Sequence, residues 1–149
     1  MSEASEKARA YFLSGDNCAQ AVFCAYADTV GVDERTAHQL SAGFGGGIGR
    51  LRDTCGALSG LVLLAGFATG DDGENPDVRA QTYALVQRLA ARFEDACGSR
   101  VCAKLLGLSN DGHYPPAPDA RTEEYYRTRP CLRFVEAACR VWEEERESR

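Results

Sequence analysis

The sequence predicts an all-α protein that folds as a single compact bundle of six to seven helices over residues 1–149. Apolar residues recur at the three- and four-residue spacing of helices through most of the chain. Segments with the alternating pattern of a half-buried strand are absent. Glycines, prolines and helix-capping residues separate the helical segments. These three observations favour a helical bundle over a mixed fold.

The first half of the chain contains three predicted helices and one segment that cannot be a stable helix. The helices cover residues 3–13, 17–29 and 34–42, and Asp33 supplies the N-cap of the third. Residues 43–49 include five glycines, each of which costs about 1 kcal/mol in a helix interior relative to alanine. We therefore expect a structural turn there, or backbone that passes tightly over a site.

The second half is predicted to contain a central helix, a long amphipathic helix and two further helices. Residues 55–69 are apolar almost all round, which is typical of a helix buried centrally. Residues 77–97 carry apolar residues along one face, and residues 100–106 and 130–146 complete the set. Residues 109–121 contain three prolines and are predicted to form a long loop. Such loops are uncommon in compact domains unless they have a function or are disordered.

Length, composition and charge indicate a soluble protein of one ordinary domain. A chain of 149 residues can bury a real core, and 44% hydrophobic with 26% charged residues is typical of globular proteins. The net charge of −5 argues against non-specific nucleic-acid binding. No signal peptide is visible, and the most apolar run, residues 57–68, is shorter than a membrane span of about 20 residues. We therefore expect a cytoplasmic protein with no nucleic-acid partner, which could form a homodimer.

Seven cysteines are a high count for such a chain. Four of them follow capping residues and are predicted to lie in the first turns of four different helices: Cys18, Cys55, Cys102 and Cys131. Unpaired N–H groups and the positive end of the helix dipole favour the thiolate there. Because the thiolate is both the nucleophile and the metal ligand, the pattern predicts a redox or metal site assembled from helix ends.

The other cysteines and both histidines are predicted to have structural or surface roles. Cys24 and Cys139 lie within helices and are interpreted as core residues. Cys97 ends a helix, where the dipole raises the thiol pKa. His38 is predicted to be a surface or packing residue, and nothing selects His113 as a functional residue.

The glycine-rich segment contributes the remaining candidates. Its N–H groups would donate to the sulfurs of a bound cluster, so the candidate cofactor-binding residues are Gly45, Gly46, Gly47 and Gly49. The segment follows a predicted helix and lacks the Walker lysine, so a nucleotide-phosphate site is not expected. Arg50 and Arg52 precede Cys55 and either favour its thiolate or are solvated at the surface.

No C-x-x-C sequence is present, which argues against a zinc ribbon, a thioredoxin-type pair and covalent c-type haem. The chain instead resembles the C-GCAxxG-C-C family of small redox-active proteins. The motifs that carry this resemblance are Asn17-Cys18-Ala19-Gln20, Cys55-Gly56-Ala57-Leu58-Ser59-Gly60, Cys102 and Cys131. The resemblance implies four cysteines acting together in redox chemistry. A related domain in split-Soret cytochromes is associated with iron–sulfur binding.

Three functions follow from these observations. The leading hypothesis is an iron–sulfur or related metal cluster held by the four helix-end cysteines, because helical bundles build sites from facing helices. The protein would then exchange electrons with a partner protein, or sense oxidants, more as a carrier than as an enzyme with a substrate pocket. The second hypothesis is a thiol–disulfide relay through reversible cysteine pairs. The third, less favoured, is a structural zinc site with four cysteine ligands.

Overall fold

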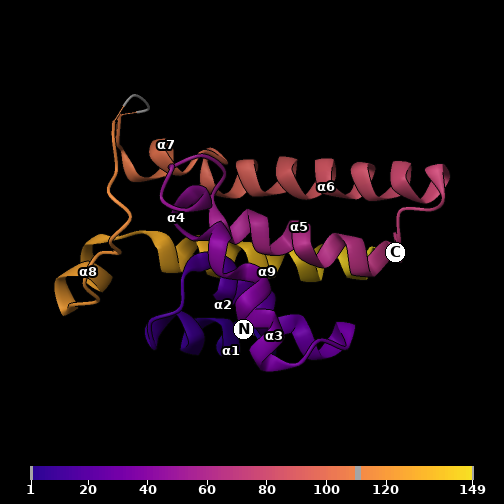
Figure 1. Ribbon diagram of the computed structural model, residues 1–149, viewed down its shortest axis with the longest axis horizontal. Coiled ribbons are helices and arrows are strands. Elements are labelled where there is room, and N and C mark those ends of the chain that lie inside the picture. The colour runs from indigo at the N-terminus through magenta and orange to yellow at the C-terminus, as the bar shows by residue number, and fades with distance from the viewer. Residues whose placement is uncertain (1, 110–111, 149) are drawn as a thin grey trace.

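The computed structural model describes residues 2–109 and 112–148, and the regular secondary structure in these residues is helical (Figure 1). The principal helices are α1 (Glu3–Leu13), α2 (Cys18–Tyr26), α3 (Glu34–Ser41), α5 (Gly56–Thr69), α6 (Pro76–Cys97), α7 (Cys102–Leu106), α8 (Glu123–Thr128) and α9 (Cys131–Glu147). Shorter elements are the 3-10 turns η1 (Ala27–Val30) and η2 (Ala42–Phe44) and the four-residue α4 (Gly45–Ile48). The all-α prediction is confirmed.

Capping side chains explain why most helices begin where the sequence predicts. The Asn17 side chain accepts a hydrogen bond from the Gln20 N–H at 2.9 Å, and the Gln20 side chain accepts one from the Asn17 N–H at 3.1 Å. This reciprocal capping box fixes the start of α2. Asp33 caps α3 by accepting from the Thr36 N–H at 3.0 Å. Each such cap stabilises its helix by about 1 kcal/mol.

The prediction missed α8, which follows the loop predicted at 109–121. The Thr122 side chain accepts a hydrogen bond from the Tyr125 N–H and caps the helix, and Glu123 and Glu124 occupy its first turn. The sequence therefore carries a start signal. The helix is only six residues long, so it lacks the apolar periodicity from which the other helices were predicted.

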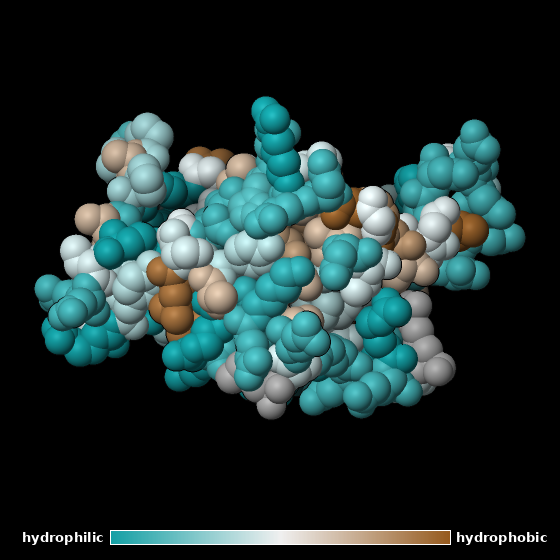
Figure 2. Space-filling model, turned by 90° about the horizontal axis from the view of Figure 1, so that it is seen from below, coloured by the Kyte–Doolittle hydropathy of each residue, from teal (hydrophilic) through white to brown (hydrophobic). Residues whose placement is uncertain are grey.

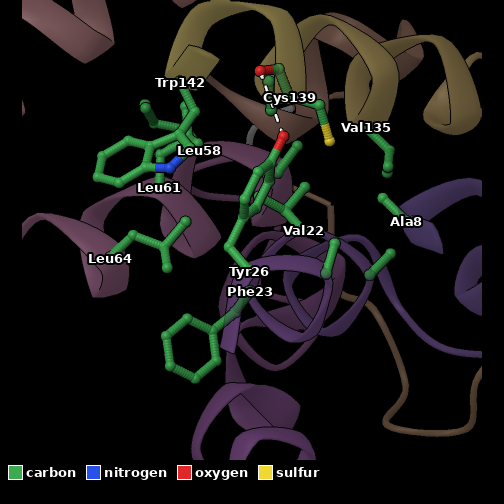
Figure 3. Close-up of a cluster of buried hydrophobic side chains, with 14 of the residues drawn as sticks. Ala8, Val22, Phe23, Tyr26, Leu58, Leu61, Leu64, Val135, Cys139 and Trp142 are labelled. Carbon is green, nitrogen blue, oxygen red and sulfur yellow. Dashed lines mark hydrogen bonds between the residues drawn. The ribbon is translucent and has the colours of Figure 1, made fainter. Parts of the chain in front are cut away.

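Helix α5 lies in the middle of the bundle, with α6 along one side and α2 along another (Figure 1). Helix α9 packs against α1, α2, α5 and α6. Figure 3 shows the core that these contacts bury, in which Leu61 and Leu64 of α5 lie near Trp142 of α9. Large apolar side chains contribute roughly 1.5–3 kcal/mol each when fully buried. The Tyr26 hydroxyl donates to the Cys139 carbonyl at 3.4 Å and to Glu143 at 2.8 Å, so its polar end is paired within this core.

Two glycines on one face of α5 allow α2 to approach closely. A Cβ atom at Gly60 would lie 2.9 Å from the Cβ of Val22, and one at Gly56 would lie 3.0 Å from the backbone nitrogen of Ala19. Real Cβ atoms rarely come this near to other atoms, so only glycine fits without movement. The same contact places the starts of the two helices together, because a Cβ at Gly56 would be 3.3 Å from the Cβ of Cys18.

The residues predicted to be structural lie away from these helix starts. Cys24 and Cys139 are buried, as predicted, and Cys97 ends α6. His38 packs beside Asp16, with Nε2 at 2.7 Å from a carboxylate oxygen and Nδ1 at 2.9 Å from the Glu34 carbonyl. All seven cysteines are free thiols.

The outer surface is mainly hydrophilic in the view from below, with separate apolar spots (Figure 2). The most exposed large apolar side chain among the described residues is Leu51, at 68%. None of the helices in the described part of the chain has the length and apolar character needed to cross a membrane.

Candidate functional site

A cavity of about 400 Å³ lies where the starts of α2, α5, α7 and α9 meet. We call it the cysteine cavity. All the site residues predicted from sequence line it, namely Cys18, Cys55, Cys102, Cys131, Gly45, Gly46, Gly47 and Gly49. Four arginines also contribute to its wall: Arg50, Arg52, Arg121 and Arg129. The structure thus brings cysteines from distant parts of the chain to one cavity beside positive charge.

Each cavity cysteine lies at a helix start. Cys18, Cys102 and Cys131 are the first residues of α2, α7 and α9, and Cys55 is the N-cap residue of α5. The predicted first-turn position is correct for Cys18, Cys102 and Cys131, whereas Cys55 immediately precedes its helix. The predicted side-chain cap is present only before Cys18, because no side chain caps α5, α7 or α9. At each of these positions, backbone N–H groups of the first turn have no partner within the helix.

An isolated antiparallel bridge between Thr54 and Val101 brings two of these helix starts together. The Cys55 N–H donates to the Arg100 carbonyl at 2.8 Å, and the Cys102 N–H donates to the Asp53 carbonyl at 2.6 Å. The whole of α6 lies between these two segments in the sequence. The bridge therefore holds Cys55 and Cys102 on neighbouring strands of backbone despite their separation along the chain.

The glycine-rich segment forms a left-handed turn beside the cavity. Five consecutive residues, 46–50, have φ angles between 55° and 71°. Glycine reaches this conformation without penalty, whereas other residues pay roughly 1–2 kcal/mol each. A Cβ atom at Gly47 would lie 2.6 Å from the Cβ of Cys102 and 2.7 Å from the Cα of Arg52. The predicted structural turn is therefore present, and it packs tightly against Cys102 and Arg52. Element α4 is not an ordinary right-handed helix.

The pKa values of Cys18 and Cys131 depend on each other. Hydrogen bonding with the Cys18 side chain is the largest cause of the shift that lowers the pKa of Cys131 to about 7. Burial opposes this shift, whereas Arg129, Arg121 and Arg52 support it. The same hydrogen bond, together with burial, raises the pKa of Cys18 well above its ordinary value. Cys131 therefore ionises first.

The expectation that every helix-end thiol ionises easily is wrong for Cys18, Cys55 and Cys102, and holds only for Cys131. Burial raises the pKa of Cys55 to about 12, against the opposing effect of the Ala57 and Leu58 N–H groups. Burial also raises the pKa of Cys102, although Arg52 opposes the shift. The physical reason is that the free-energy cost of removing a thiolate from water is larger here than the stabilisation that the helix start provides.

Arg52 is not the solvated surface residue that was one of the two roles predicted for it. Its side chain is buried rather than solvated, with 6% of the residue exposed. Its Nη1 lies 3.7 Å from the sulfur of Cys102, and Arg52 opposes the rise in the pKa of that thiol. The Nε of Arg52 is a buried nitrogen for which the described residues supply no hydrogen-bond acceptor.

The loop predicted at 109–121 covers the cavity in the part that the structure describes. Arg121 donates to the carbonyl oxygens of Phe12 at 3.0 Å and Asp16 at 2.8 Å, which ties the loop to the end of α1. Asp119 pairs with Arg129 at 2.5 Å and with Arg50 at 3.4 Å. Residues 110–111, which belong to the predicted loop, lie outside the described residues. His113 is exposed and is not part of the cavity wall.

Comparison with known proteins agrees with this arrangement. Residues 16–145 match the family described as "Putative redox-active protein (C_GCAxxG_C_C)". The chain belongs to this family. The matched range contains all four cavity cysteines and the left-handed turn. No match was found among curated proteins or among solved structures.

The central family motif has a physical explanation in this structure. This member of the redox-active family has Cys55-Gly56-Ala57-Leu58-Ser59-Gly60 at the start of α5. Cys55 lines the cavity, whereas Gly56 and Gly60 make the close contact with α2. The motif therefore supplies a thiol and also the glycines that place a second thiol, Cys18, beside it.

Several residues that line the cysteine cavity were not predicted from the sequence. Arg121, Tyr125 and Phe134 line it, and Tyr125 has a pKa raised to about 12, chiefly by burial and then by the nearby Cys131. The Thr122 capping signal before α8 could have placed Tyr125 on a helix. No local signal marks Arg121, because its role depends on contacts with α1.

The four thiols line the cavity without converging on one point. Across residues 2–109 and 112–148, no three His, Cys, Asp or Glu side chains are grouped closely enough to hold a metal ion. A single zinc ion needs four donors at roughly 2.0–2.3 Å. This chain shows the redox family's cysteines gathered around one cavity, and a preformed single-ion site is not present among the described residues.

Proposed function

We propose that this protein binds an iron–sulfur cluster, or a related metal cluster, through Cys18, Cys55, Cys102 and Cys131. The observation that carries the proposal is that four thiols from four separate helix starts line one cavity. When bound, such a cluster supplies one-electron chemistry. The protein would then transfer electrons to or from a partner protein, or sense oxidants through cluster loss.

The cavity fits a cluster in its donor atoms and in its charge. Thiolates are the usual ligands of iron–sulfur clusters. Four thiolates carry substantial negative charge, and the cavity offsets it with arginines and the positive ends of helices. Thiols distributed around about 400 Å³ also suit a group of several atoms better than a single zinc ion.

The test is anaerobic purification, or reconstitution with iron and sulfide, followed by visible absorption and analysis of iron and acid-labile sulfide. We expect broad visible absorbance with matched iron and sulfide. Alanine substitution of any one of the four cavity cysteines should abolish or strongly reduce both. Cys24→Ala and Cys97→Ala are matched controls, because neither residue lines the cavity.

Two results would contradict the cluster. Protein that contains no iron after anaerobic handling and reconstitution would count against it. Zinc in equal amount to protein, without sulfide, would instead support the structural zinc site. In that case removal of zinc by a chelator should unfold the protein.

A thiol–disulfide relay is the second candidate, supported by the contact between Cys18 and Cys131. One thiol is held beside another whose pKa is about 7, which is the arrangement that favours attack by a thiolate. In this reaction the two thiols lose two electrons and two protons and form one disulfide, while a disulfide of a partner protein is reduced to two thiols. The free-thiol count would fall by two in colourless protein, and Cys18→Ala or Cys131→Ala would prevent the fall.

A further inference from the structure

Arg52 is the buried cation of the cysteine cavity and it has an unused hydrogen-bond donor. Its Nε is enclosed, and no acceptor among the described residues reaches it. A buried donor of a charged group is costly to leave without a partner, by more than the roughly 1–3 kcal/mol of a neutral one. Such a group in a native fold therefore calls for a partner that binds there.

The other cavity arginines already have partners in the described structure. Arg50 donates through Nε to the Pro115 carbonyl at 2.8 Å. Arg129 pairs with Asp119, and Arg121 donates to two carbonyl oxygens at the end of α1 and beyond it. These three arginines bind the loop at residues 112–121 to the rest of the fold, whereas the Nε of Arg52 has no hydrogen-bond acceptor among the described residues.

The backbone holds Arg52 in an unusual conformation that fixes where its side chain begins. Its φ angle is 63°, which is uncommon for a residue other than glycine. The Arg52 N–H donates to the Gly46 carbonyl at 3.2 Å, and its carbonyl accepts from the Ala103 N–H at 3.1 Å. Residue 52 is thus tied to both the left-handed turn and α7. Strained backbone of this kind is concentrated at functional sites.

We propose that Arg52 binds an anion inside the cysteine cavity through its Nε–H, beside Cys102. The proposal rests on the proposed function in one respect, because the anion is then a sulfide of the cluster. A free oxyanion such as inorganic phosphate presents the same acceptor chemistry. If the anion is cluster sulfide, the hydrogen bond and the positive charge stabilise the reduced cluster and raise its reduction potential.

Three variants separate the hydrogen bond from the charge. Arg52→Lys keeps a positive charge without the Nε–H, and Arg52→Met removes both. Arg100→Met is the matched control, because Arg100 lies close to Cys102 in sequence but its side chain is exposed and pairs with Glu94 at 2.6 Å. Circular dichroism of each protein checks folding, and Arg52→Lys decides the question if Arg52→Met does not fold.

The first measurement is the midpoint reduction potential of each reconstituted protein. We expect a lower potential in Arg52→Met, a smaller decrease in Arg52→Lys and no change in Arg100→Met. The second measurement is the thermal midpoint of the metal-free proteins with and without inorganic phosphate at constant ionic strength. A phosphate-dependent increase that is lost in Arg52→Met, with the potential unchanged, would identify a free oxyanion as the ligand.

The two measurements also separate this proposal from the cluster itself. If the wild-type protein assembles no cluster, the proposed function fails and the phosphate measurement alone decides the role of Arg52. If neither the potential nor the response to phosphate depends on Arg52, the anion-binding role is overturned, whether or not a cluster forms.

Discussion

Gly60 of α5 lies so close to Val22 of α2 that no side chain fits between them. A Cβ atom at residue 60 would be 2.9 Å from the Cβ of Val22 and 3.1 Å from the Ala19 carbonyl oxygen. Overpacking typically costs about 1–3 kcal/mol, and the gain in helix propensity offsets about 1 kcal/mol of it. We therefore expect Gly60→Ala to lower the free energy of unfolding by up to about 2 kcal/mol. Urea denaturation measures the difference.

Gly66 on the same helix provides the control for this prediction. A Cβ atom there meets nothing within 4 Å, so the substitution changes stability only through the higher helix propensity of alanine. Gly66→Ala should leave the protein equally stable or stabilise it by up to about 1 kcal/mol. Equal losses of stability in both variants would mean that the close contact between α2 and α5 is unimportant.

The hydrogen bond between Cys18 and Cys131 predicts the pH dependence of alkylation in the metal-free protein. Because the pKa of Cys131 is lowered to about 7, its labelling rate with iodoacetamide should rise with a midpoint near pH 7. Cys18→Ala removes the donor, so the midpoint should move upward and the rate at pH 7 should fall roughly tenfold or more. Mass spectrometry of the labelled Cys131 peptide gives the rate.

Cys18→Ser keeps an O–H donor at the same position and should retain most of the lowered pKa. Cys97, whose pKa is raised mainly by burial, is an internal standard whose labelling should not change. An unchanged Cys131 profile in Cys18→Ala would show that the arginines alone, without the thiol, lower its pKa.

The ion pair between His38 and Asp16 predicts a stability difference that depends on pH. Burial lowers the pKa of His38, but the Glu34 carbonyl and Asp16 outweigh it, so the net pKa is raised. A raised pKa means that the stabilisation is complete below the ordinary value of 6.5 and is lost as the pH rises through the folded-state pKa. Asp16→Asn should therefore lower the free energy of unfolding more at pH 6 than at pH 9. Because the pair is partly exposed, we expect the loss at pH 6 to be at most about 1 kcal/mol.

Urea denaturation at the two pH values measures this difference. In a His38→Gln background, Asp16→Asn should change the free energy of unfolding by the same amount at pH 6 and pH 9, since the titrating histidine is gone. A difference between the two pH values that persists in this background would assign the pH dependence to another group.

Ile48 occupies the left-handed turn with φ at 67°, which is a poor conformation for a β-branched residue. Asparagine tolerates this conformation better than other residues with a Cβ, apart from aspartate. Since Ile48 is 38% exposed, little packing is lost on substitution. We expect Ile48→Asn to raise the free energy of unfolding by about 1 kcal/mol. Ile48→Val, which keeps the branched Cβ, should not; if it stabilises equally, relief of backbone strain is not the cause.

The starts of α2 and α3, and with them the position of Cys18, could be predicted because their causes are local. Asn17 and Asp33 cap helices through hydrogen bonds that span three residues, so the sequence contains the whole interaction. The glycine-rich segment was predicted as a turn for the same reason, since glycine content alone disfavours a regular helix.

The rest of the site depends on contacts between distant segments. Arg121 acts on the carbonyl of Phe12, and Arg52 lies beside Cys102 rather than Cys55. Positive φ angles at Arg50 and Arg52 go against the preference of the residue type. The raised pKa of Cys55 follows from burial that only the assembled bundle produces. None of these effects has a signature within a short stretch of sequence.

The wide spacing of the cavity cysteines along the chain also has a consequence for biosynthesis. Cys18 leaves the ribosome early, whereas Cys131 follows only after α1 to α8 have been made. A partial chain therefore lacks the last thiol, and Cys131 comes into place only when α9 packs against α1, α2, α5 and α6. A group that needs all four thiols can therefore bind only after the whole chain has been synthesised and α9 has packed. The order of synthesis thus prevents such a group from binding to a partial chain.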